Sequence, residues 1–156
     1  MSAAPALSSN IGCAHDADLP WVSLGEGIEL KVLRVVEPAG LWVIRNRFAA
    51  GVQIPRHRHT GEVHGFTLQG CWHYIEYGID YPAGSYIHEP ANSVHTLRVP
   101  ADNPGPTDIL FVIQGANLNL DEEGKVWRVD DGPTTLAVYL EVCAQQGRGR
   151  PPVLLQ

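Results

Sequence analysis

The fold of this chain is indicated most clearly by the stretch GVQIPRHRHTGEVHGFTLQG, residues 51–70. It contains His57 and His59, which are separated by a single residue. On a β-strand, two side chains at this spacing point to the same face and lie roughly 6.5–7 Å apart along the backbone. Two imidazoles placed in this way can bind one metal ion, although two surface histidines on a strand are a common alternative. The surrounding sequence has to decide between these interpretations.

A second stretch, GIDYPAGSYIHEPANSVH at residues 78–95, supplies a third histidine, His95. Together the two stretches match the paired motifs of the cupin family. The first motif, G(X)5HXH(X)3–4E(X)6G, is matched at Gly51, His57, His59 and Gly70, and the second at Pro82, Gly84 and His95. The chain therefore resembles the cupin family over about residues 40–100, and the segment from YPAGSY to Pro90, Ser93 and His95 resembles its ChrR-like branch. The resemblance implies a double-stranded β-helix, or jelly-roll barrel.

The distribution of Gly and Pro along the chain independently predicts an all-β domain. Its 16 Gly and 12 Pro separate short runs that are rich in β-branched and aromatic residues. We predict strands near residues 28–37, 41–49, 52–59, 64–69, 72–77, 84–89, 94–99, 109–114, 117–120 and 125–129. One short C-terminal helix is expected, because Leu136, Tyr139, Leu140 and Cys143 follow helical spacing and Gly147 ends it. We expect a single cupin domain over residues 18–147, with loose termini at 1–17 and 148–156.

Composition excludes several other classes of protein. A chain of 156 residues fits one domain, and 17 acidic against 11 basic residues give a net charge of −6. Without a Lys/Arg cluster, neither nucleic acid nor an anionic membrane is an expected partner. Three cysteines without a CxxC spacing indicate neither a disulfide framework nor a zinc knuckle. Because no signal peptide or membrane span is visible, we expect a cytoplasmic protein.

One position departs from the cupin pattern. The glutamate ligand of the first motif should lie at position 63, where this chain has Val63. Strand alternation points Glu62 and His64 away from the face of Val63. Either a bulge or a longer loop brings Glu62 or His64 into the ligand position, or His57, His59 and His95 hold the metal alone. We expect the three histidines alone.

A three-histidine site suits a non-heme iron that must bind substrate and dioxygen side by side. The resemblance implies the same, because the acetylacetone-cleaving dioxygenases and 2,4′-dihydroxyacetophenone dioxygenase are cupins with three-histidine iron sites. In the diketone-cleaving type, a glutamate six residues before the last histidine supports the site, and Glu89 stands six residues before His95. Glu89 is therefore the candidate catalytic carboxylate, with a solvated strand-end charge as its alternative. Fe(II) is the expected metal, while imidazoles also suit Zn, Ni and Cu.

Several other side chains are candidates for the wall of a substrate cavity. Arg45 lies on the strand before the first motif and could bind an anionic substrate oxygen if its face points inward. For Arg45, His73 and Glu76, exposure at the surface is the commoner situation. Aromatic residues such as Trp72 and Tyr74 belong more often to a core than to a substrate platform. The complete set of candidates is Arg45, Val63, His64, Trp72, His73, Tyr74 and Glu76, whereas His88 should face the other way.

These observations favour an Fe(II)-dependent dioxygenase that cleaves a carbon–carbon bond beside a carbonyl in a β-diketone or an aryl hydroxyketone. Its partners would be the small-molecule ketone and O2, and its assembly a homodimer or homotetramer. A non-catalytic sensor domain that binds zinc, as in the ChrR-like anti-sigma factors, is the main alternative. A cupin isomerase that works without O2 is a third.

Overall fold

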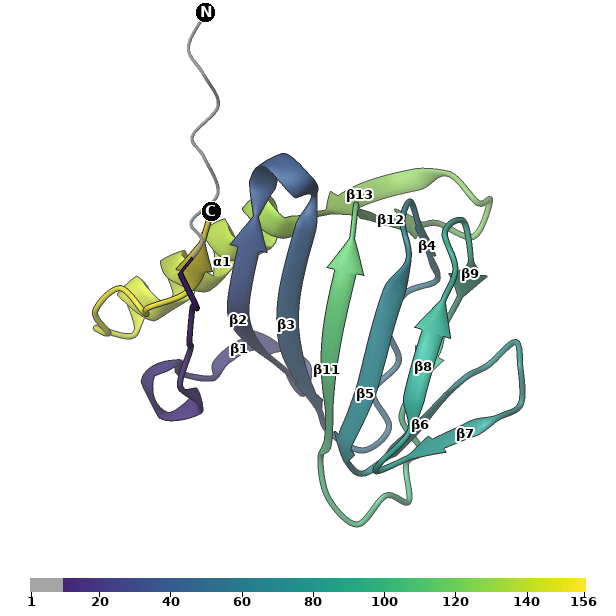
Figure 1. The fold of residues 1–156 in the computed structure, drawn as a ribbon. Coiled ribbons are helices and arrows are strands. Elements are labelled where there is room, and N and C mark those ends of the chain that lie inside the picture. Colours follow the sequence, from purple (N-terminus) through teal and green to yellow (C-terminus); the bar gives the residue numbers. More distant parts are fainter. Residues whose placement is uncertain (1–9) are drawn as a thin grey trace, which may run out of the picture.

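A large curved sheet forms one layer of the molecule in the computed structural model, which describes residues 10–156 (Figure 1). Its strands lie in the spatial order β1-β2-β3-β11-β5-β8, and β14 pairs with β2. Their bounds are β1 (Val22–Gly25), β2 (Ile28–Val36), β3 (Leu41–Phe48), β5 (Val63–Gln69), β8 (Tyr86–Glu89), β11 (Thr107–Gln114) and β14 (Leu154–Leu155).

Two smaller sheets face the inner side of the large sheet. One has the order β13-β12-β4-β9 and the other β10-β6-β7. Their strands are short, because turns with Gly, Pro and Asp interrupt them. Their bounds are β4 (His57–His59), β6 (Cys71–Tyr74), β7 (Asp80–Pro82), β9 (Val94–His95), β10 (Leu97–Arg98), β12 (Asn117–Leu120) and β13 (Val126–Asp130). The predicted all-β architecture is therefore confirmed for the described residues.

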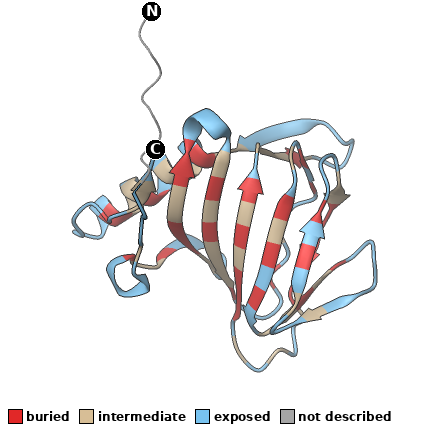
Figure 2. Cartoon of the chain, in the orientation of Figure 1, coloured by how far each residue is buried: buried red, intermediate tan, exposed pale blue. Residues whose placement is uncertain are grey.

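The inner face of the large sheet carries the core. Along β3 and β11, buried residues alternate with partly exposed ones, which produces the banding in Figure 2. Trp42 and Ile44 of β3 and Phe111 and Ile113 of β11 point inward and are buried. This period of two is the consequence of strand geometry when one face packs and the other meets water.

The single predicted helix is α1 (Gly132–Gln145), which packs beside β1 and β2. Its start is fixed by a capping box, in which the Asp131 carboxylate accepts from the Thr134 backbone N–H and the Thr134 hydroxyl accepts from the Asp131 N–H. Tyr139 is fully buried and donates a hydrogen bond to the Pro20 carbonyl at 2.7 Å. Gly147 adopts a φ of 67°, as expected after the helix end.

The observed strands differ from the predicted ones in three ways. The predicted strand at 52–59 is reduced to β4, because Pro55 has no N–H to donate. The predicted strand at 94–99 divides into β9 and β10 at Thr96, whose N–H donates to the Glu76 carboxylate at 2.9 Å instead of to a strand. Three short strands, β1, β7 and β14, were not predicted.

The expectation of a loose C-terminal segment is wrong for residues 154–155. Leu154 and Leu155 pair in parallel with Arg34 and Val35 of β2. At the other end, the expectation of a loose segment falls partly on residues 1–9, which lie outside the described residues. Beyond them, the 3₁₀-helices η1 (Asp16–Asp18) and η2 (Glu37–Ala39) flank the sheet.

Over residues 10–156, no helix has both the length and the apolar character needed to cross a bilayer.

Candidate metal centre

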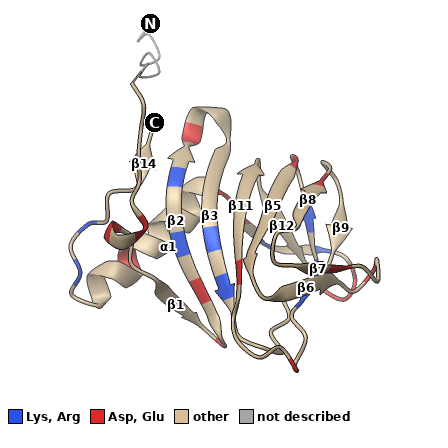
Figure 3. Ribbon diagram, turned by 60° about the horizontal axis from the view of Figure 1, so that its bottom comes forward, with Lys and Arg blue, Asp and Glu red and all other residues tan. Residues whose placement is uncertain are grey.

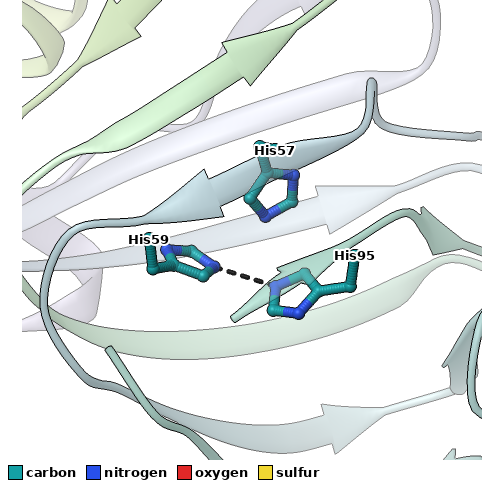
Figure 4. Close-up of side chains that lie close together, drawn as sticks. All are labelled: His57, His59 and His95. Carbon is teal, nitrogen blue, oxygen red and sulfur yellow. Dashed lines mark hydrogen bonds between the residues drawn. The ribbon is translucent and has the colours of Figure 1, made fainter. Parts of the chain in front are cut away.

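Three buried histidines converge between the two layers, on β4 and β9 (Figure 4). His57 and His95 are direct cross-strand partners, and His59 lies two residues further on the same face of β4. The intervening Arg58 is exposed, so the alternation predicted for the HxH pair is present. The three ring centroids lie 4.8–4.9 Å apart. One nitrogen of each ring falls within 4.8 Å of the other two, so the structure brings the predicted ligands together.

Hydrogen bonds to Nδ1 fix the tautomers of two of these rings. The Nδ1 of His57 lies 2.9 Å from the Pro55 carbonyl, and the Nδ1 of His59 lies 2.6 Å from the Asn117 Oδ1. Since both oxygens only accept, each Nδ1 carries the proton. The neutral form of each ring then has its lone pair on Nε2, directed at the centre, which is the arrangement typical of metal-ligating histidines.

Glu89 of β8 enters the centre from the opposite sheet. Its Oε2 lies 2.9 Å from the His59 Nε2 and 3.6 Å from the His95 Nε2. Its Oε1 accepts a hydrogen bond from the Tyr74 hydroxyl, and the Tyr74 ring stacks on His95 at a centroid distance of 3.8 Å. Glu89 is only 3% exposed, so it is part of the site and not a solvated strand-end charge.

Burial shifts the charge states of this group towards neutrality. Loss of hydration, with a smaller contribution from His59, lowers the pKa of His57 to about 4. Loss of hydration, together with His57 and His59, lowers the pKa of His95 to about 2. Burial also raises the pKa of the Glu89 carboxyl, an effect that the neighbouring His59 ring opposes. His57 and His95 are therefore neutral at pH 7, the form that binds metal.

The donor set fits a divalent metal ion. The Nε2 atoms of His59 and His95 lie 2.9 Å apart, beside the carboxylate of Glu89. Electron pairs facing one another at this distance repel unless a cation or a proton lies among them. A cation bound by His57, His59 and His95, with Glu89 beside it, satisfies these atoms together.

The centre opens into a cavity of about 460 Å³ between the layers. Its walls are mainly apolar, and include Trp42, Ile44, Phe48, Phe111 and Ile113. This volume lies in the usual range for small-molecule sites, roughly 300–1,000 Å³. Its polar lining residues include Asn117 and Asn119 of β12, Arg128 and Asp130 of β13, and Thr134 and Thr135 of α1.

Val63 and Tyr74 are the two candidate wall residues that line this cavity. Val63 is 1% exposed and is the direct cross-strand partner of Glu89. The alternative in which Glu62 or His64 takes the missing ligand position is wrong. Strand β5 runs without a bulge at this point, and both side chains lie on its outer face in contact with His88 or Tyr86.

The other candidate wall residues lie elsewhere. Arg45 points to the outer face of β3, where it pairs with Asp16 and Asp108 among the charges visible on β2 and β3 in Figure 3. Trp72 is fully buried in the core, and its Nε1 donates to the Thr67 hydroxyl at 2.8 Å. His73 and Glu76 also lie outside the cavity; the His73 Nδ1 is 3.5 Å from Asp80, and Glu76 accepts from Thr96.

Sequence reasoning missed the residues that orient the ligands. Asn117 reaches His59 because β12 pairs with β4 and places these two residues opposite each other. No local pattern gives this pairing, since the two residues are 58 positions apart. The only sequence signal was that Asn117 and Asn119, two polar residues on one face of a predicted strand, are both short hydrogen-bonding side chains.

Comparisons with known proteins agree with this geometry. A family model described as the ChrR cupin-like domain matches residues 11–117. A protein of unknown function with a cupin-like fold from Ralstonia eutropha is 30% identical, with a TM-score of 0.88, covering 96% of this chain and 94% of its own. Comparison with curated proteins gave no match.

Two further solved structures share the fold at lower identity. An acetylacetone dioxygenase from Acinetobacter johnsonii is 18% identical, with a TM-score of 0.76, covering 91% of this chain and 98% of its own. The anti-sigma factor ChrR, solved with SigE from Rhodobacter sphaeroides, is 19% identical, with a TM-score of 0.53, covering 64% of this chain and 51% of its own. The predicted cupin fold is thus confirmed, and the chain belongs to the ChrR cupin-like domain family.

Proposed function

We propose that this protein is an Fe(II)-dependent dioxygenase that cleaves a carbon–carbon bond beside a carbonyl in a β-diketone or an aryl hydroxyketone. The observation that carries the proposal is the placement of a buried carboxylate, Glu89, among three histidines in an apolar cavity. The acetylacetone dioxygenase with the same fold supports the reaction class. The choice of iron depends on that reaction class, because imidazole ligands also suit other metals.

The ligands in this proposal are His57, His59 and His95. Bound Fe(II) would supply Lewis acidity towards the substrate oxygens and reactivity towards dioxygen. The apolar walls would exclude water and accept the carbon skeleton of the ketone. Glu89 would take the proton from the carbon beside the carbonyl onto Oε2, while Tyr74 holds Oε1. Its raised pKa suits a base that must keep and later return a proton.

Oxygen uptake tests this proposal. Protein loaded anaerobically with Fe(II) is offered acetylacetone, 2,4′-dihydroxyacetophenone and related ketones, with His95→Ala as the control. Uptake that requires both a ketone and His95 is the expected result. Uptake that persists without His95 would contradict the assigned site.

A second candidate function is a domain that binds zinc without catalysis, and the similarity to the ChrR cupin-like domain and to the anti-sigma factor ChrR supports a non-catalytic role. Such a domain would retain zinc tightly and consume no oxygen with any ketone. Metal analysis of the protein as isolated, made beside the uptake measurement, distinguishes the two functions.

A further inference from the structure

A second group of metal-ligating side chains lies on the outer face of the large sheet. Glu62, His64 and His88 each offer one ligand atom, and these atoms all lie within 4.8 Å of one another. His64 and His88 are direct partners on the antiparallel strands β5 and β8, with ring centroids 5.3 Å apart. Glu62 comes from the loop just before β5. Three ligands from two strands and a loop are thus gathered at one point.

The contacts within this outer cluster direct one nitrogen of each ring to one carboxylate. Glu62 Oε2 lies 3.0 Å from the His88 Nε2, and Glu62 Oε1 lies 3.6 Å from the His64 Nε2. The other nitrogen of His64, Nδ1, lies 2.5 Å from the Tyr86 hydroxyl. A hydroxyl oxygen on Nδ1 can accept its proton and leave the lone pair on Nε2, which is the support that ligand histidines usually have.

The outer cluster is separate from the three-histidine centre. His64 follows Val63, and His88 precedes Glu89, so the alternation of the strands places the two groups on opposite faces of one sheet. Val63 and Glu89 face the cavity, while the side chains of His64 and His88 are 33% and 46% exposed. The two groups therefore share no ligand.

We propose that Glu62, His64 and His88 form a second divalent-metal site, selective for zinc-type cations. Two imidazoles and one carboxylate suit Zn²⁺ and its neighbours in the transition series, whereas Mg²⁺ and Ca²⁺ prefer sets of oxygen ligands. A divalent ion here would replace the contacts in which one carboxylate serves two histidines. Because the site is open to solvent, water would complete its coordination and binding would be weaker than at the buried centre.

Zinc titration of metal-free protein against a chromophoric chelator tests the proposal. The wild type should bind two equivalents, and the double variant His64→Ala, His88→Ala should bind one. His73→Ala removes a histidine outside both groups and should leave two. Tyr86→Phe should keep the second equivalent but weaken it by about tenfold, because a supporting hydrogen bond is lost.

The double variant His57→Ala, His95→Ala removes the buried centre and should bind one equivalent of zinc. That equivalent should disappear when His64 and His88 are also replaced. A wild type that binds a single equivalent, and keeps it in His64→Ala, His88→Ala, would overturn the proposal. So would an outer double variant that still binds two. If the inner variant does not fold, the comparison of the wild type with the exposed outer variant is sufficient by itself.

Discussion

At the residue scale, Glu89 supplies the buried carboxylate of the three-histidine centre. Val63 stands where the cupin motif has a glutamate, and Glu89, its cross-strand partner, brings a carboxylate to the histidines from the neighbouring strand. The carboxylate is 3% exposed and touches two of the three histidines. A carboxylate so placed can act as a base or as a metal ligand, and substitution separates the two roles.

Glu89→Gln keeps the shape of the side chain but removes its basicity. We expect bound iron to be retained and ketone-dependent oxygen uptake to fall by about 10²-fold, the usual contribution of a general base. Metal content and uptake are measured on the same preparation. Tyr74→Phe, which leaves the carboxylate intact, should have a smaller effect. A Gln variant that loses its iron would show instead that Glu89 is a ligand.

His57 makes the stability of the metal-free protein dependent on pH. Its folded pKa of about 4 lies below the ordinary value of 6.5, so between these values the unfolded state binds more protons than the folded state. The free energy of unfolding therefore has its full value above pH 6.5. It declines as the pH falls from 6.5 towards 4. This one group accounts for a loss of about 3 kcal/mol across that interval.

Urea unfolding at several pH values, with metal removed, measures the decline. His57→Gln should have a flatter profile over the same interval. His15→Gln, at an exposed position, should follow the wild type. Identical slopes for wild type and His57→Gln would contradict the assigned shift.

At the scale of elements, β14 completes an edge of the large sheet. β1 pairs with β2 from Ile28 to Leu30, and β14 pairs with β2 at Arg34 and Val35, so the two strands cover different parts of one edge. The Gln156 N–H also donates to the Val35 carbonyl at 3.1 Å. An uncovered edge exposes unpaired backbone groups and invites association with other chains.

Deletion of residues 150–156 should therefore lower the free energy of unfolding by about 1–3 kcal/mol, from lost hydrogen bonds and packing. It should also promote aggregation. Thermal unfolding with light scattering detects both effects. Arg34→Ala, which removes the side-chain bond to Gln156 but leaves β14 in place, should do neither. An unchanged deletion variant would mean that β14 adds nothing to stability.

At the scale of the molecule, the two layers enclose a cavity of about 460 Å³, and for the proposed reaction we expect its size to select among ketones. Neighbouring residues of β11 make a direct test, because Ile113 faces the cavity and Val112 faces outward. We expect Ile113→Trp to raise KM for an aryl ketone far more than for acetylacetone, since the added ring fills the cavity. Val112→Trp should change neither value. Equal effects of the two variants would show that the substrate binds elsewhere.

The local features of this protein could be predicted from its sequence. The HxH spacing put His57 and His59 on one face, the run after Asp131 gave the helix, and Gly and Pro marked the turns, because these depend on neighbours in the chain. These features follow from backbone periodicity and turn chemistry. His95 and Glu89, in contrast, became candidates for the site through the resemblance to the cupin family.

The face of each strand that meets the cavity, and the contacts between distant residues, depend on how the sheets pair and pack. Arg45 and Trp72 were candidates for the wall, yet Arg45 points outward to Asp108 and Trp72 packs in the core. Asn117 was unforeseen, because its contact with His59 depends on the register between two strands far apart in sequence. A shift of one residue in that register would turn each side chain to the other face, so the pairing of the sheets had to be known before the site could be completed.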